Sequence, residues 1–361
     1  MEPFKNVFNE KFVNKLAQAI ASYDKSFKKE KYLSLIMSKL EALELKERMR
    51  LISSEINNYS DLSYVKMLEV LKKSKTHFSY EENMGLASMV FPDFVEVYGL
   101  DDLSESLSAL ENFTIDSSSE FAIRAFILKY EDETMAQMLK WAKSKNEHIR
   151  RFASEGCRPR LPWAVALPPF KNNPKKVFEV LELLKNDESL YVRKSVANNL
   201  NDISKDNEDM LLSFVALNIN KTKNTDWILK HASRTLLKKG NKKILAYFGY
   251  KETEHIQLNN LSLSKSVSLG ENLEFSFDLS ANEALGNLRI EFELDFVRLN
   301  NKRGHKVFMI SQGTHSTNNK TINKKYSFKK ITAREYYKGE HFLSIILNGK
   351  KLETKNARCL V

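Results

Sequence analysis

The segment His148-Ile-Arg-Arg-Phe-Ala-Ser-Glu-Gly-Cys-Arg-Pro-Arg-Leu-Pro-Trp163 combines four arginines, one carboxylate and one tryptophan in sixteen positions. Its first half predicts a helix, because three apolar residues fall on one face: Ile149, Phe152 and Ala153. Gly156 predicts the end of this helix, and two prolines keep the following segment extended. Glu155 would then lie at the negative end of the helix dipole, which local preference disfavours. We interpret this position as a sign that Glu155 has a role other than helix stability.

The same pattern recurs twice further along the chain. Ile149-Arg-Arg-Phe-Ala-Ser aligns with Val192-Arg-Lys-Ser-Val-Ala and with Ile228-Leu-Lys-His-Ala-Ser, at steps of 43 and 36 residues. Such steps are typical of HEAT-like helical pairs, which stack side by side and leave a concave face lined by equivalent positions. One equivalent position is basic in all three segments and is predicted to recur along that face: Arg151, Lys194 and Lys230.

Helical periodicity extends over residues 1–255, with short polar joints between the segments. Beyond residue 255 apolar and polar residues alternate, over 273–279 and again over 288–296, which predicts half-buried strands. Further strands are expected at 306–312, 321–330 and 341–347, and Asn348-Gly349 predicts a hairpin turn. The sequence therefore predicts a multidomain α and β protein. An N-terminal α-solenoid of HEAT-like repeats (1–255) precedes an all-β, antiparallel immunoglobulin-like sandwich (256–361).

The 361 residues carry a formal net charge of +11, and residues 257–361 hold 17 Lys and Arg against 10 Asp and Glu. This positive charge belongs either to an ordinary solvated surface or to the binding site of a polyanion, most often nucleic acid. No apolar run is long enough to span a membrane, and the first residues lack the pattern of a signal peptide. Two cysteines, Cys157 and Cys359, stand far apart. We therefore expect a cytoplasmic protein with no membrane partner.

The sequence lacks the motifs of several enzyme classes. The seven histidines are scattered, and His-x-x-x-His and Cys-x-x-Cys pairs are absent, so no metal site is predicted. A glycine-rich phosphate loop and a Gly-x-Ser-x-Gly elbow are absent as well. Cationic neighbours would lower the pKa of the Cys157 thiol. Because no histidine partner is identifiable, we interpret Cys157 as a small residue that fills space at a helix end.

Carboxylates and aromatic residues remain as candidates, and each has a structural alternative. Ser117 and Glu120 have the spacing of a helix capping box. Glu155 is four residues from Arg151, which suits an ion pair on one helix, and Trp163 suits packing beneath the next repeat. Taken together, they also suit hydrolysis of a cationic N-glycoside. That reaction needs a carboxylate near an oxocarbenium-like sugar and benefits from an aromatic face near the positive charge.

Three segments resemble the motifs of AlkC-type DNA alkylation repair glycosylases, a helical-repeat family related to AlkD. They are Arg150–Trp163, Ser119-Glu-Phe-Ala-Ile-Arg124 and Trp227-Ile-Leu-Lys-His-Ala-Ser-Arg-Thr-Leu-Leu-Lys-Lys-Gly240. The resemblance covers essentially the whole chain, including the C-terminal immunoglobulin-like domain of one subgroup. It implies a monofunctional glycosylase that removes 3-methyladenine and 3-methylcytosine from double-stranded DNA, with no metal or other cofactor. It also implies that the base is not flipped into a deep pocket.

The resemblance implies that the catalytic residues are Glu120, Glu155 and Trp163. It further implies that Arg151 and Arg158 contact the DNA at the lesion and the adjacent backbone. Other basic residues are candidates for DNA binding from their place in the repeat, in the basic loop or at the tip of the sandwich: Arg160, Lys194, Lys230 and Arg303. We expect a monomer, because a single wrapped duplex suits one chain.

Two other functions stay open at this point. The protein is alternatively a non-catalytic HEAT-repeat scaffold that binds protein partners or damaged or bent DNA. Such a scaffold leaves Glu155, at its unfavourable helix end, without a role. A damage-binding protein that recognises bent DNA without cutting it is the second alternative, and release of free base separates an enzyme from both.

Overall fold

The computed structural model describes residues 3–78, 84–331 and 335–360. The chain folds into two compact units. The first unit extends to Leu211 and also includes Asn218–Ala232, whereas the second contains Leu212–Leu217 and the chain from Ser233 onward. The predicted change from helices to strands falls between the last helix, which ends at Tyr247, and the first strand, which begins at Gln257. The domain limits 1–255 and 256–361 stay predictions.

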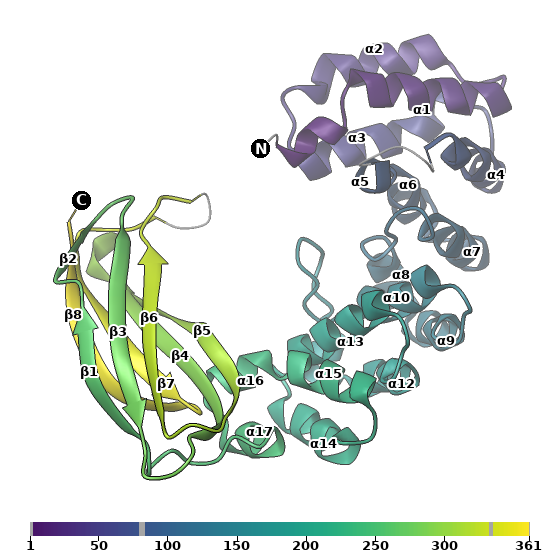
Figure 1. The fold of residues 1–361 in the computed structure, drawn as a ribbon. Helices are drawn as coiled ribbons and strands as arrows, with labels where there is room; N and C mark the ends of the chain where they lie inside the picture. The colour runs from purple at the N-terminus through teal and green to yellow at the C-terminus, as the bar shows by residue number, and fades with distance from the viewer. Residues whose placement is uncertain (1–2, 79–83, 332–334, 361) are drawn as a thin grey trace. The chain divides into compact units, whose positions relative to one another are not determined.

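Helices make up the chain as far as Tyr247 (Figure 1). In order, the α-helices are α1 (Glu10–Tyr23), α2 (Lys29–Leu40), α3 (Leu45–Ile56), α4 (Tyr64–Lys75), α5 (Met84–Ala87), α6 (Val90–Tyr98), α7 (Leu103–Phe113), α8 (Ile123–Lys129), α9 (Glu131–Trp141), α10 (Glu147–Gly156), α11 (Pro168–Asn172), α12 (Lys175–Leu184), α13 (Leu190–Ile203), α14 (Glu208–Asn218), α15 (Lys223–Ala232), α16 (Arg234–Lys238) and α17 (Lys242–Tyr247). Short 3-10 helices lie at Phe4–Val7, Asn57–Tyr59 and Thr76–Phe78. None of the helices in the described ranges has both the length and the apolar character needed to cross a membrane.

Helix α10 has the buried face that the sequence predicts. Its apolar residues are all buried: Ile149, Phe152 and Ala153. The Phe152 ring packs against Trp141 of α9, with 4.8 Å between the ring centroids. The helix ends at Gly156 as predicted, and the glycine also permits close packing, since a Cβ there would lie 2.8 Å from Cγ2 of Ile123. The last turn of α10 therefore lies directly against α8.

The predicted repeat is visible in the contacts of two equivalent arginines. Arg150 and Arg193 each donate two hydrogen bonds from Nη1 to the carbonyls five and six residues earlier, at 2.8–3.0 Å. Helix α10 packs against α13, and α13 packs against α15. The three aligned segments therefore lie on α10, α13 and α15, which pack one against the next, and only Ser233 falls beyond the end of α15 (Figure 1).

Strands follow the helices and form two sheets (Figure 1). They are β1 (Gln257–Leu263), β2 (Ser266–Ser268), β3 (Asn272–Ser280), β4 (Gly286–Val297), β5 (Arg303–His315), β6 (Asn319–Ser327), β7 (Gly339–Leu347) and β8 (Lys350–Leu360), with a 3-10 turn at Leu299–Asn301. The sheet orders are β1-β3-β6 and β2-β8-β7-β4-β5. The antiparallel prediction is wrong for one pair, because the short strand β2 runs parallel to β8.

One apolar core lies between the two sheets. The predicted alternation in β3 is observed, since Leu273, Phe275, Phe277 and Leu279 are all buried. Phe275 of β3 contacts Phe292 of β4 in the other sheet, with ring centroids 5.0 Å apart. Asn348 and Gly349 join β7 to β8 with φ of 44° and 80°, the positive values that a two-residue type I′ hairpin requires. The predicted order of helices followed by a β-sandwich is confirmed.

Candidate active site

The last turn of α10 and the loop after it line a cavity in the first unit, with a volume of about 470 Å³. Its lining includes Glu120, Glu155 and Trp163, together with Arg158. Apolar side chains from the N-terminal part of the chain complete the wall: Phe8, Leu45, Met49 and Met89. The three residues predicted to be catalytic therefore meet at one cavity, although the segment that carries Glu120 is distant in sequence from the other two.

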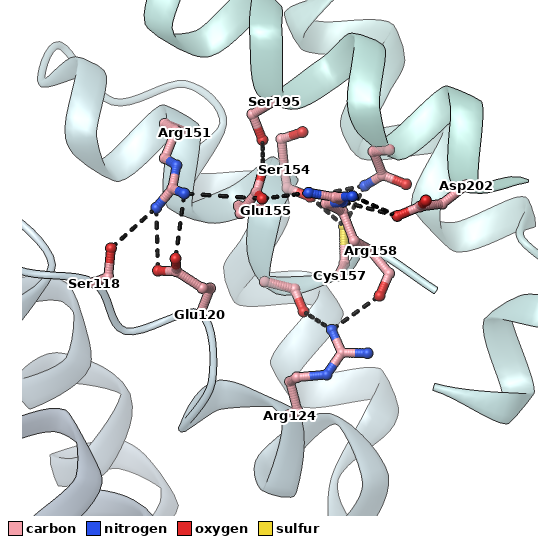
Figure 2. A network of polar contacts seen from close by, with 12 residues as sticks. Ser118, Glu120, Arg124, Arg151, Ser154, Glu155, Cys157, Arg158, Ser195 and Asp202 are labelled. Carbon is pink, nitrogen blue, oxygen red and sulfur yellow. Dashed lines mark hydrogen bonds and ion pairs between the residues drawn. The ribbon is translucent and has the colours of Figure 1, made fainter. Parts of the chain in front are cut away.

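Glu155 is the second-to-last residue of α10, and only 6% of it is exposed. Its Oε2 accepts a hydrogen bond from Ser195 Oγ of α13 (2.6 Å), and its Oε1 accepts one from Arg158 Nη1 (2.5 Å) (Figure 2). The predicted ion pair with Arg151 is present, with Nη2 3.8 Å from Oε1, but it is longer than the other two contacts. These donors offset the unfavourable helix dipole and fix the carboxylate at the cavity.

Glu120 lies just before α8 and forms a bidentate pair with Arg151. The distances are 3.1 Å from Nη1 to Oε2 and 3.2 Å from Nη2 to Oε1. Figure 2 shows contacts from this guanidinium to both Glu120 and Glu155. Burial disfavours the charged form of Arg151, but the two carboxylates outweigh burial and raise its pKa. One guanidinium thus connects both candidate catalytic groups.

The capping-box interpretation of Ser117 and Glu120 is wrong. Helix α8 begins only at Ile123, so Glu120 lies outside its first turn. Ser117 Oγ donates instead to the carbonyl of Gly85 (3.1 Å). Because the segment before α8 is not helical, the Glu120 carboxylate can turn toward α10 and the cavity.

Two residues of α13 that sequence reasoning missed support the site: Ser195 and Asp202. Asp202 Oδ2 lies 2.8 Å from both Nε and Nη2 of Arg158, whose Nη1 contacts Glu155. Arg158 and Asp202 are only 6% and 2% exposed, so this pair is buried. A signal for Ser195 exists in the repeat, where this serine aligns with the buried Phe152. No such signal exists for Asp202.

Trp163 is 65% exposed, and its backbone has φ of 65°, in the left-handed region that bulky residues rarely adopt. Its carbonyl accepts a hydrogen bond from Lys46 Nζ of α3 (2.6 Å). The alternative that Trp163 packs beneath the next repeat is therefore wrong. The exposed indole lines the cavity on a strained backbone, and such strain is concentrated at functional sites in proteins.

The loop that carries Trp163 is anchored by Arg124 of α8, which is 1% exposed. Arg124 Nη1 donates to the carbonyls of Gly156 (3.2 Å) and Arg158 (2.9 Å), and its Nε donates to that of Val165 (Figure 2 shows the two Nη1 contacts). Burial lowers the pKa of Arg124 to about 10, which leaves it charged at neutral pH. Arg124 is the last residue of the motif Ser119–Arg124, but the motif alone did not predict this anchoring role.

Comparison with known proteins shows that the chain is similar to DNA repair proteins. The family model described as "DNA alkylation repair enzyme" matches residues 84–236, and the model of the C-terminal Ig-like domain of YhaZ matches residues 257–358. The chain is 31% identical to the Pseudomonas fluorescens alkylpurine DNA glycosylase AlkC, whose solved structure is bound to DNA containing an abasic site analog. That similarity covers 100% of both chains, with a TM-score of 0.95. The chain belongs to the AlkC-type DNA glycosylase family.

A second relative of this AlkC-type chain is the uncharacterized protein YhaZ of Bacillus subtilis (strain 168). The two are 44% identical over 353 residues, which is 97% of each chain. The family predicted from three sequence motifs is confirmed. The predicted fold, a helical-repeat region followed by an immunoglobulin-like sandwich, is confirmed as well.

Three of the arginines proposed to bind DNA are already paired with carboxylates of the first unit of the AlkC-type chain, and Arg151, paired with Glu120 and Glu155, is the first of them. Arg158 is buried against Glu155 and Asp202. Arg160 forms a two-pronged pair with Asp206, with 2.6 Å from Nε to Oδ2 and from Nη2 to Oδ1. Their contacts with DNA stay predictions, and for Arg158 a role in holding Glu155 agrees better with its burial.

The other DNA-binding candidates are spread over both units. Lys194 is exposed on α13, and Lys230 is partly buried on α15. Arg303 of β5 pairs with Asp295 of β4, with Nε 3.0 Å from Oδ1. Their roles in DNA binding stay predictions.

Cys157, the cysteine whose reactivity the sequence left to be tested, is fully buried, and its burial raises the thiol pKa to about 12. We therefore expect iodoacetamide at pH 8 to leave Cys157 unmodified in the folded AlkC-type protein and to alkylate it fully in denaturant. Mass spectrometry of the peptide that contains Cys157 measures both. Rapid alkylation of the folded protein would contradict the space-filling interpretation.

Proposed function

We propose that this protein is a monofunctional DNA glycosylase that hydrolyses the N-glycosidic bond of cationic alkylated bases in double-stranded DNA. 3-Methyladenine and 3-methylcytosine are its proposed substrates. The observation that carries the proposal is that Glu120, Glu155 and the exposed Trp163 line one cavity. Family membership supports it, as does the AlkC relative whose structure holds DNA with an abasic site analog. We further propose that it acts in the cytoplasm, as a monomer and without a metal or cofactor.

The chemistry follows from the charge of the substrate. An N3-methylated adenine or cytosine is cationic, so its glycosidic bond breaks when the C1′–N electron pair moves to the base and neutralises it. The sugar becomes oxocarbenium-like, and a water molecule adds to C1′ and loses a proton. A carboxylate beside C1′ stabilises the sugar cation, and a carboxylate can also orient the water and take its proton. We assign these tasks to Glu120 and Glu155.

We assign Trp163 to binding the cationic base. A cation is attracted to the face of an indole within about 6 Å of the ring, and this ring is exposed beside the carboxylates. Because the positive charge already activates the leaving base, no general acid is needed at the base. The base therefore need not be enclosed in a deep pocket, in contrast to most glycosylases.

Release of free bases from DNA that is methylated as single strands and then annealed tests the proposal, because base pairing blocks methylation at N3 of cytosine. We expect the wild-type protein to release 3-methyladenine and 3-methylcytosine, detected by mass spectrometry, and to leave abasic sites that alkali cleaves. DNA without methylation and DNA without the protein are the controls. Tight binding to methylated DNA with no free base would instead support the damage-binding alternative, which binding measurements alone cannot distinguish from an enzyme.

A further inference from the structure

The repeat that aligns the basic residues also aligns three planar side chains. His148, Tyr191 and Trp227 each stand immediately before the first residue of an aligned segment, at the same steps of 43 and 36 residues. They belong to α10, α13 and α15, which pack one against the next. The basic residues of the repeat follow three positions later and so lie on the same side of each helix. We call His148, Tyr191 and Trp227 the ring row.

Two members of the ring row are exposed, and each has a guanidinium beside it. Tyr191 is 41% exposed and Trp227 is 37% exposed. The Arg151 guanidinium lies 5.3 Å from the Tyr191 ring centroid, and that of Arg193 lies 5.7 Å from the Trp227 centroid. The Trp227 ring also lies parallel to the His231 ring, with 5.2 Å between the centroids. On two successive repeats, a ring thus has beside it a guanidinium from the preceding helix of the row.

The ring row begins beside the candidate active site. Arg151, which contacts the Tyr191 ring, is the same residue that connects Glu120 and Glu155. His148 and Tyr191 are themselves in contact, with 5.5 Å between ring centroids. Trp227 lies one helix further along the repeat. A strand that passes through the site can therefore continue across α13 to α15.

Exposed rings interleaved with cations fit one class of partner. Successive unpaired bases stack on aromatic side chains while the neighbouring cations attract the phosphates, and this combination binds single strands with little sequence preference. Base faces inside a duplex are covered by neighbouring pairs and cannot reach such rings. The net charge of +11 suits the same partner.

We infer that the ring row binds an unpaired DNA segment next to the lesion, so that the protein removes alkylated bases from single-stranded as well as from double-stranded DNA. The inference rests on the proposed glycosylase function and extends its substrate class. It assigns Tyr191 and Trp227 a role in binding the flanking strand and leaves the bond-breaking step to the carboxylates.

The first test compares binding of a methylated single-stranded oligonucleotide with binding of its duplex. Tyr191→Ala and Trp227→Ala are each expected to weaken single-strand binding by about 5- to 100-fold and duplex binding by much less. Tyr191→Phe and Trp227→Phe keep a ring and are expected to restore most of the affinity, which separates lost stacking from misfolding.

Tyr23→Ala is the matched control. Tyr23 of α1 is 43% exposed, its ring centroid lies 5.9 Å from that of His77, and Lys73 Nζ lies 5.9 Å from its ring centroid. It therefore has the same type of surroundings as Tyr191 but lies outside the ring row. We expect no change in single-strand affinity.

The salt dependence of DNA binding distinguishes the contribution of the rings from that of the cations. The alanine variants of the ring row should keep the wild-type slope of log Kd against log salt, because rings neutralise no phosphate, whereas Lys194→Ala should reduce the slope by about one. The wild type is expected to release base from single-stranded DNA, and at subsaturating protein Trp227→Ala should release it about 5- to 100-fold more slowly. Release from duplex but none from single strands, or unchanged single-strand affinity in both alanine variants, would overturn the inference. Absence of release from either substrate would instead refute the proposed function.

Discussion

Glu155→Gln is expected to slow base release from methylated duplex DNA by about 100- to 1000-fold while fold and DNA affinity are retained. The amide has the shape of the carboxylate and can still accept the hydrogen bond from Ser195, which is 2.6 Å long in the wild type. It carries no charge to stabilise an oxocarbenium-like sugar. Single-turnover rates at saturating protein measure the effect on bond breaking without a contribution from product release.

Glu120→Gln is expected to have an effect in the same direction, since Glu120 is the other glutamate of the cavity and shares Arg151 with Glu155. Glu147→Gln is the matched control, because Glu147 lies on the same helix α10 but is exposed in its first turn. Thermal unfolding of all three variants checks that the fold is intact. Wild-type rates in both Glu155→Gln and Glu120→Gln would show that the carboxylate mechanism is wrong.

Arg158→Met is expected to destabilise the protein by about 3–5 kcal/mol, because it leaves two buried carboxylates without their shared cation. Those carboxylates are Glu155, at 2.5 Å from Nη1, and Asp202, at 2.8 Å from Nη2, and the side chains of both are less than a tenth exposed. Urea unfolding followed by circular dichroism measures the change in the free energy of unfolding.

Arg160→Met provides the comparison for this second prediction. Arg160 also contacts a carboxylate through two nitrogens, but its side chain is 38% exposed, so the expected loss is below about 1 kcal/mol. If Arg158 acted mainly on DNA phosphates, Arg158→Met would keep its stability and show a smaller salt slope of binding. Equal stability of Arg158→Met and wild type would therefore contradict the structural role assigned to Arg158.

Local periodicity predicted much of the fold. The buried face of α10, the alternation in β3 and the hairpin at Asn348-Gly349 each depend on residues that are neighbours in the chain. The parallel pairing of β2 with β8 was missed, because it joins residues about ninety positions apart and leaves no mark in either short segment. Contacts of this kind are set by the packing of the whole sandwich.

In the site, too, contacts between residues close in sequence could be predicted and contacts between distant residues could not. The position of Glu155 at the end of a helix, next to Arg151 and Arg158, follows from spacing within one helix and its loop. Asp202 could not be predicted, since its pairing with Arg158 spans 44 residues. Glu120 was interpreted as part of a capping box because local spacing cannot reveal that Arg151 of α10 lies within hydrogen-bonding distance of its carboxylate.

The left-handed backbone at Trp163 lowers the stability of the fold, whereas the indole of the same residue is proposed to serve base removal. Glycine or asparagine adopts such a φ more readily and would relieve strain of about 1 kcal/mol. Either replacement would remove the exposed indole from the cavity. A laboratory selection for thermal tolerance alone would therefore favour loss of this tryptophan, whereas a selection under alkylating stress would retain it. The two selections, run in parallel on one library, should diverge first at residue 163.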